Sequence, residues 1–265
     1  IVGPRPHRRP QAQTIRTGHR NPAKLDFDTS RPAYTPRGYS VEQDAGRVQE
    51  FGTELTEQEW ADLLRHRRPR RLPAGTPLFI EGTRSDTVVI VISGWIKVFT
   101  SAEDGTEVVL AMRGPGALLG ELAMIDGQPH SASVKSLAAT EILTVGLREF
   151  TAFLQTHPRT MWLLMRILTD RLREADRKRI EFGVYDTLNR VARRLVELAD
   201  RFGEPTESGI KITLPLTQDE LASWVGASLE AVTKALRILR TDGYVRTQRR
   251  TFTVIDVERL RRRAH

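Results

Sequence analysis

The chain has 265 residues, of which 39% are hydrophobic, so it can form two modest domains with proper cores. It contains no cysteine, which excludes disulfides, thiolate zinc sites, a cysteine-ligated iron–sulfur cluster and a catalytic thiol. No apolar run approaches the roughly 18 residues that cross a bilayer, so we expect a cytoplasmic protein that does not insert into membranes.

The net charge of +8 is concentrated at the two ends of the chain. Residues 1–40 hold eight Arg or Lys against two Asp, residues 41–183 hold 18 against 20, and residues 184–265 hold 15 against 11. This pattern favours a polyanion as partner of the ends. Residues 1–48 are proline-rich and lack a hydrophobic period, which predicts a disordered basic arm. The arm either adds nonspecific phosphate contacts or is a passive solvated tail.

Residues 49–155 are predicted to form a β-barrel domain. A capping box, Thr56 with Glu59, opens a short helix, and the basic run Arg65–Arg71 after it is predicted to be a solvated turn. Asp104-Gly105 is a strong hairpin signal. Many short strands with no long helix between them favour a small β-sandwich or jelly roll and exclude a Rossmann fold. The predicted strands are Leu78–Ile80, Val88–Ile92, Ile96–Thr100, Val108–Met112, Ala132–Ser136 and Glu141–Val145.

Residues 156–183 are predicted to form a dimerisation helix, which follows a short helix over Glu149–Leu154. Apolar side chains recur there at intervals of three and four, a narrow stripe typical of a two-stranded coiled coil. The alternative is that the helix packs only on its own barrel. The stripe that is predicted to form the dimer interface consists of Met161, Leu164, Leu168, Leu172 and Ala175.

Residues 184–265 are predicted to form a winged helix-turn-helix domain. Asp186 can cap a helix over Thr187–Phe202, and a second capping box, Thr217 with Glu220, opens a helix that Gly226 ends. Ser228 caps the next helix, which buries one apolar face and can enter the DNA major groove. The wing is predicted from two short strands, Tyr244–Thr247 and Thr251–Ile255, joined around Gln248-Arg249-Arg250.

The order of barrel, long helix and winged helix-turn-helix resembles the cyclic-AMP receptor protein/FNR (CRP-FNR) family of bacterial transcription regulators, over roughly residues 50–257. The resemblance implies an α+β fold with an N-terminal β jelly roll. It also implies a homodimer that binds two DNA half-sites at the nucleoid and recruits or blocks RNA polymerase. The residues that carry it are Ser93-Gly94, Asp104-Gly105, Gly120-Glu121-Leu122, Ser131-Ala132, Val184-Tyr185-Asp186, and Thr217, Glu220, Val225-Gly226, Ser228-Leu229-Glu230 and Lys234.

The resemblance also implies a ligand pocket. In family members that bind cyclic AMP, amides at a Gly-Glu-Leu helix start receive the phosphate, the Glu accepts from the ribose, an Arg-Ser pair neutralises the phosphate, and a Thr-Ser pair bonds the adenine. Here His130-Ser131 and Ala175-Asp176 stand at the last two pairs, so we expect cyclic AMP to bind poorly. A different ligand and no small effector both stay open. The candidate pocket residues are Gly120, Glu121, Leu122, His130, Ser131, Ala175 and Asp176.

On DNA, family members that read a GTGA-type half-site use Arg-Glu-x-x-x-Arg on the recognition helix. The matching residues here are Leu229, Glu230 and Lys234, beside Thr233, which predicts a half-site altered at the guanine that the first Arg would read. Phosphate contacts position the protein on DNA without reading the base sequence, and we expect them from Gln218, Ser228, Arg249 and Arg250.

The residues leave two other functions to consider. An architectural protein that coats or bends DNA is favoured by the basic arm. An enzyme is disfavoured because the sequence shows no nucleophile–base set, no phosphate-cradling P-loop and no ligand-spaced pair among its six His. We therefore expect no catalytic and no metal site.

Overall fold

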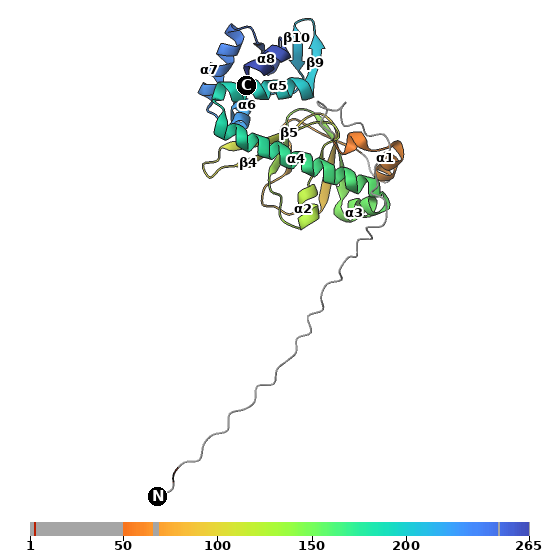
Figure 1. The fold of residues 1–265 in the computed structure, drawn as a ribbon. Helices are drawn as coiled ribbons and strands as arrows, with labels where there is room; N and C mark the ends of the chain where they lie inside the picture. The colour runs from red at the N-terminus through yellow and green to blue at the C-terminus, as the bar shows by residue number, and fades with distance from the viewer. Residues whose placement is uncertain (1–2, 4–49, 66–68, 249, 265) are drawn as a thin grey trace, which may run out of the picture. The chain divides into compact units, whose positions relative to one another are not determined.

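A computed structural model describes Gly3 and residues 50–65, 69–248 and 250–264 (Figure 1). The chain divides into two units, Ile1–Gln43 and Asp44–His265, and the elements below all belong to the second. Apart from Gly3, the predicted arm of residues 1–48 lies outside the described residues.

A β-sandwich follows a 3-10 turn (Gly52–Glu54) and helix α1 (Glu57–Leu64). It consists of two four-stranded antiparallel sheets, which agrees with the predicted jelly roll, and the six predicted strands form nearly at their expected ends. One sheet has the order β1 (Arg70–Leu72), β8 (Thr140–Gly146), β3 (Thr87–Ser93) and β6 (Leu118–Leu119). The other has the order β2 (Pro77–Phe79), β7 (Ser133–Ser136), β4 (Ile96–Ser101) and β5 (Glu107–Arg113).

Strand β1 corrects the end of the predicted solvated turn over Arg65–Arg71, at Arg70 and Arg71, whereas residues 66–68 lie outside the described residues. Arg70 pairs with Ile142 and Leu72 with Thr140 of β8. Leu72 is buried, and Arg70 and Arg71 are exposed. Because β1 is the edge strand of its sheet, the last two arginines of the basic run can pair in the sheet and still meet solvent.

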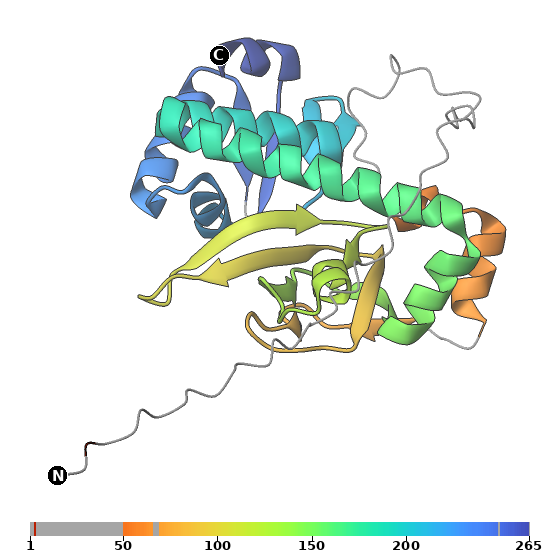
Figure 2. The same cartoon turned by 60° about the horizontal axis from the view of Figure 1, so that its bottom comes forward.

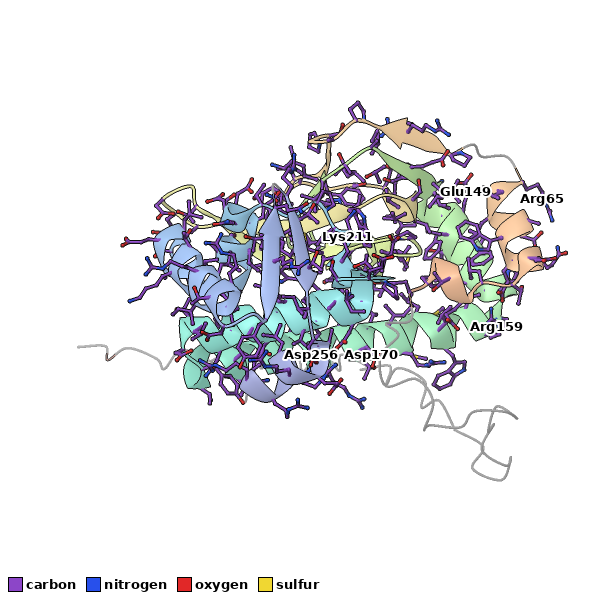
Figure 3. The ribbon with its side chains drawn as sticks, turned by 90° about the horizontal axis from the view of Figure 1, so that it is seen from above. Arg65, Glu149, Arg159, Asp170, Lys211 and Asp256 are labelled. Atoms are coloured by element: carbon purple, nitrogen blue, oxygen red, sulfur yellow. The ribbon has the colours of Figure 1, made fainter. Side chains whose placement is uncertain are left out.

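Helix α4 (Pro158–Val184), which runs along the barrel in Figure 1, packs one face on its own barrel and leaves another face exposed. It follows α3 (Leu147–Thr156) and buries Leu163, Leu164 and Ile167 in the same apolar cluster as Leu143. Near its start, Arg159, labelled in Figure 3, donates to the Glu59 carboxylate of α1.

The exposed stripe of α4 differs from the predicted seam at one position. Leu164 is only 2% exposed within its own chain, so it is not available to a partner, and its place in the predicted dimer interface is wrong. Met165, which is 42% exposed, takes that place. The corrected seam alternates strictly between intervals of four and three, as a coiled coil requires. We call these five residues the α4 seam: Met161, Met165, Leu168, Leu172 and Ala175.

The C-terminal part is a winged helix-turn-helix, as predicted. Its helices are α5 (Thr187–Phe202), α6 (Gln218–Val225), α7 (Leu229–Thr241) and α8 (Val257–Arg263). Its sheet has the order β11 (Val245–Gln248), β12 (Thr251–Val254), β10 (Gly209–Ile212) and β9 (Gly203–Thr206). The hairpin β9–β10 and helix α8, which starts at its cap Asp256 (Figure 3), were not predicted.

The barrel and the DNA-binding part share one apolar core. Val109 and Met112 of β5 are buried in the same cluster as Leu195 of α5 and Trp224 of α6. In Figure 2 the long strands β4 and β5 lie beside the helix pair α4 and α5.

Polar groups also cap the outer edge of β5, which is the last strand of its sheet. Ser223 Oγ of α6 accepts from Val109 N at 3.1 Å and donates to the carbonyl of Glu107. Lys178 Nζ of α4 donates to the carbonyl of Leu110 at 2.9 Å.

Candidate DNA interface and sensor cradle

The turn between α6 and α7 is built by local sequence. Thr217 accepts from Glu220 N at 3.1 Å, and the Glu220 carboxylate accepts from Thr217 N at 2.8 Å, so both ends of the predicted capping box are closed. Gly226 ends α6 at φ 61°, a left-handed conformation that glycine adopts at low cost. Ser228 then caps α7 by accepting from Ala231 N at 3.2 Å.

Helix α7 presents one apolar and one exposed face. Its buried residues are Val232, Ala235, Leu236 and Leu239. The four residues predicted to read bases, Leu229, Glu230, Thr233 and Lys234, are all exposed on the other side. Leu229 is 46% exposed, which is unusual for a leucine and leaves its side chain available to a base edge.

The residues around α7 frame this face. Thr233 Oγ1 donates to Gln218 Oε1 at 3.2 Å and so joins the start of α6 to the recognition helix. Arg240 Nη1 donates to Thr247 Oγ1 at 3.3 Å and joins the end of α7 to the wing. Arg250 lies at the wing turn with φ 59°, whereas Arg249 lies outside the described residues. We name this surface, from Gln218 through the exposed residues of α7 to Arg250, the α7 face.

Sequence reasoning missed three cations of the α7 face, Arg237, Arg240 and Arg246, all exposed on α7 and β11. Arg237 and Arg240 follow Thr233 and Lys234 at helical spacing, and that signal was available in the sequence.

The second candidate site, the sensor cradle, is the barrel loop around helix α2 (Glu121–Asp126). The buried carboxylate of Glu121 accepts from Arg171 Nη1 of α4 at 2.6 Å. Arg171 Nη2 donates to the carbonyl of Leu118 at 2.9 Å and lies 3.5 Å from a carboxylate oxygen of Glu50. Both acidic groups at the cradle are therefore paired with the same guanidinium.

His130 lies deep in the cradle and is only 6% exposed. Its ring lies against Phe79 with centroids 4.2 Å apart and the ring planes tilted by 34°, and its main chain donates to Thr83 O and accepts from Gly82 N. Its Nε2 atom has no hydrogen-bond partner among the described residues. Burial lowers the pKa of His130 below its ordinary value of 6.5, although the negative charge of Glu121 opposes that shift.

The structure gathers only part of the predicted pocket. Gly120, Glu121 and His130 lie together around Phe79, whereas Leu122 and Ser131 are exposed. Ala175 and Asp176 are exposed one turn past Arg171 on α4, where Asp176 pairs with Arg179 at 3.5 Å. Arg171, which was not among the predicted pocket residues, is the residue of α4 that reaches the cradle.

These residues do not fit a cyclic phosphodiester. A buried anion needs a cation or several donors to replace its hydration. The guanidinium that lies beneath the cradle, that of Arg171, is paired with Glu121 and Glu50, and the exposed Arg84 donates to the carbonyl of Gly127 at 3.3 Å. Burial lowers the pKa of His130, so its imidazole supplies no fixed positive charge at neutral pH.

In the part of the chain that the structure describes, no group of three or more His, Asp or Glu residues could hold a metal ion. No helix among these residues is long and apolar enough to cross a membrane.

Two family models match the chain: "Cyclic nucleotide-binding domain" over residues 69–157 and "Crp-like helix-turn-helix domain" over residues 189–263. The CRP-like cAMP-activated global transcriptional regulator of Mycobacterium tuberculosis is 33% identical over 204 residues, which cover 77% of this chain and 91% of the relative. The Cyclic AMP receptor protein of Thermus thermophilus is 32% identical and covers 71% of this chain and 84% of its own length.

Two solved structures of regulators have a similar fold. The c-di-GMP responsive global regulator CLP of Xanthomonas campestris superposes with a TM-score of 0.66 at 25% identity, covering 76% of this chain and all of that one (100%). A CRP/FNR-family transcriptional regulator of Thermus thermophilus superposes with a TM-score of 0.61, also at 25% identity, over 74% of this chain and 98% of its own. The Mycobacterium tuberculosis relative and both solved structures are named as regulators.

Proposed function

The chain belongs to the CRP family of DNA-binding transcription regulators, and from that premise we propose that it acts as a homodimer that reads an operator of two half-sites. The α4 seam supports the dimer. Met161, Met165 and Leu172 are exposed large apolar side chains at heptad spacing, and a second copy of α4 would bury them.

The α7 face supplies the readers of each half-site. Glu230 accepts from a cytosine amino group, and Lys234 donates to a guanine, singly rather than bidentately. Leu229 contacts a thymine methyl or no base at all, so the half-site lacks one guanine of the GTGA type. Gln218, Ser228, Arg249 and Arg250 hold the phosphates on either side. The single observation that carries this proposal is the exposure of all four reader positions on one face of α7.

Selection of bound fragments from a random duplex library tests the proposal. We expect a palindrome whose half-sites differ from the GTGA type at one guanine. The variant Leu229→Arg should restore that guanine, because a bidentate contact contributes about 1–3 kcal/mol of discrimination. Recovery of the unaltered GTGA palindrome by the native protein, or equal binding to all duplexes, would contradict the assignment.

RNA polymerase is the proposed protein partner, through the β9–β10 hairpin, which occupies the Glu204–Gly209 segment that some family members use for that contact. We place the protein at the bacterial nucleoid, where operator DNA is. Residues 1–48 are proposed to add phosphate contacts next to the operator. Removing them should then lower affinity for all duplexes alike.

A further inference from the structure

We infer that the sensor cradle excludes 3′,5′-cyclic nucleotide monoanions and that His130 is the residue that decides this. The matching domain model and the names of the two relatives reported above point to cyclic nucleotides, so this inference separates the chain from those relatives. It depends on three observations at the cradle.

The first observation is the state of His130. Its ring is more than nine-tenths buried, and its Nε2 has no partner among the described residues. A buried imidazole packed against Phe79 offers a single neutral donor or acceptor, whereas a phosphodiester oxygen pair is matched by a two-pronged cation.

The second observation concerns the other charges. Glu121 places a carboxylate next to His130, which would repel an anion bound there. Arg171 could offset that repulsion only by leaving Glu121, the Leu118 carbonyl and Glu50 together. Leaving them would break both hydrogen bonds and the ion pair with Glu50, and would leave two buried carboxylates with only the longer-range charge of Arg113, at a large cost in free energy.

The third observation is steric. The ring of Phe79 lies against both His130 and the backbone of Gly120, where an added Cβ atom would come within 3.2 Å of Phe79 Cζ and 3.0 Å of the Thr87 carbonyl. The space beside the Gly120 backbone is therefore filled by an aromatic ring and a carbonyl oxygen, and the carbonyl oxygen would repel a phosphate placed there.

Calorimetric titration of cyclic AMP into the full-length protein, without DNA, tests the inference. We expect no saturation below millimolar concentration for the native chain and saturable binding at least about tenfold tighter for His130→Arg, since a guanidinium supplies the missing cation. The matched control is His130→Gln, which keeps a neutral side chain and should stay as weak as the native chain.

Micromolar binding of cyclic AMP by the native chain would overturn the inference, and so would a folded His130→Arg variant that binds no better than His130→Gln. Folding of both variants is checked by their thermal melts. If His130→Arg fails to fold, titration of native protein with cyclic AMP against uncharged adenosine still decides: tighter binding of the anion overturns the inference. These titrations omit DNA, so their outcome is independent of the proposed operator contacts.

Discussion

Phe182, near the end of α4, lies directly against Gly226 in the turn between α6 and α7. A Cβ atom built on Gly226 would come within 2.6 Å of Phe182 Cε1. Arg190 of α5 completes the contact, with its guanidinium 5.5 Å from the centre of the Phe182 ring and its Nη2 donating to the carbonyl of Gly226 at 3.4 Å. Helix α4 thus contacts the turn of the helix-turn-helix at Gly226.

Gly226→Ala should cost more stability than its backbone angle alone explains. Gly243 is the matched control, because it has a similar positive φ, 73° against 61°, but no atom within 4 Å of its added Cβ. We expect Gly243→Ala to lower the free energy of unfolding by about 1–2 kcal/mol from left-handed strain. Gly226→Ala should lose a further 1–3 kcal/mol, roughly, through overpacking against Phe182. Denaturant melts measure both, and equal losses would rule out a role for the Phe182 contact.

Glu174 is the central residue of the ion cluster between barrel and helices. It lies 3.3 Å from Arg113, 2.8 Å from Lys178 and 3.5 Å from Arg201. Burial opposes its ionisation, but these three cations outweigh that effect and lower its pKa far below the ordinary 4.5. Glu174→Gln leaves Arg113 buried without its counter-charge and should cost about 3–5 kcal/mol of unfolding free energy. The control is Asp176→Asn, at an exposed position of the same helix, which should cost about 0–1 kcal/mol of unfolding free energy.

The same carboxylate makes a prediction about acid. Since its folded pKa is lowered, its contribution is complete above pH 4.5 and is lost progressively as the pH falls below that value. The Glu174→Gln chain should therefore lose less stability than the native chain between pH 4.5 and its acid transition. If the unfolding free energies of the two proteins fell equally with pH over that range, the assignment would be contradicted.

Leu172→Lys should weaken the proposed dimer. Leu172 is 64% exposed in the middle of the α4 seam, and a lysine there would place a charge in an apolar interface. We expect the dimer dissociation constant, measured by analytical ultracentrifugation, to rise at least about tenfold. Thr169→Lys, on an exposed position outside the seam, is the control. A dimer unaffected by Leu172→Lys would place the interface elsewhere.

The wing arginines should contribute affinity without sequence preference. Replacing Arg249 by Gln and Arg250 by Asn, which tolerates the φ of 59° at that position, removes two proposed phosphate contacts. The slope of log K against log salt should flatten by about 0.9 for each phosphate that is no longer neutralised. A change in the selected operator, with the slope unaltered, would mean that the wing reads bases instead.

His130 should make the native fold less stable in mild acid. Because its folded pKa is lowered, the fold keeps this contribution above the ordinary pKa of 6.5 and loses it as the pH falls toward the folded value. His130→Gln removes the titrating group. The amount by which the unfolding free energy of the native chain exceeds that of the variant should therefore shrink as the pH falls from 7.5 to 5.5. A constant difference would mean that His130 titrates alike in the folded and unfolded chains.

Local signals in the sequence were enough for the helix-turn-helix. Thr217, Gly226 and Ser228 each set a helix end through contacts within a few residues, and such contacts can be read directly from residue type and spacing. Six of the barrel strands and both wing strands could also be predicted, because turn residues separate them, whereas the short strands β1, β6, β9 and β10 were missed. Helix α8 was missed because its cap, Asp256, directly follows a strand, and because the short, mostly charged helix has too few apolar positions to show a period.

The cradle and the seam could be predicted only in part, because both depend on how α4 is rotated against the barrel. Leu164 and Met165 are adjacent apolar residues, and periodicity alone does not say which one faces the chain's own core. The same rotation brings Arg171 to Glu121 and leaves Ala175 and Asp176 in solvent. These are long-range relationships that residue spacing along one helix does not encode.

The capped edge of β5 limits how this protein can be divided. Ser223 and Lys178 occupy amide and carbonyl groups that would otherwise be open along the last strand of the sheet. Cutting the chain before α4 would leave a bare, partly apolar strand edge, with Val108 and Leu110 already exposed, ready to recruit the same edge of another copy. The sensor region is therefore expected to aggregate when expressed by itself, although it resembles a self-contained module.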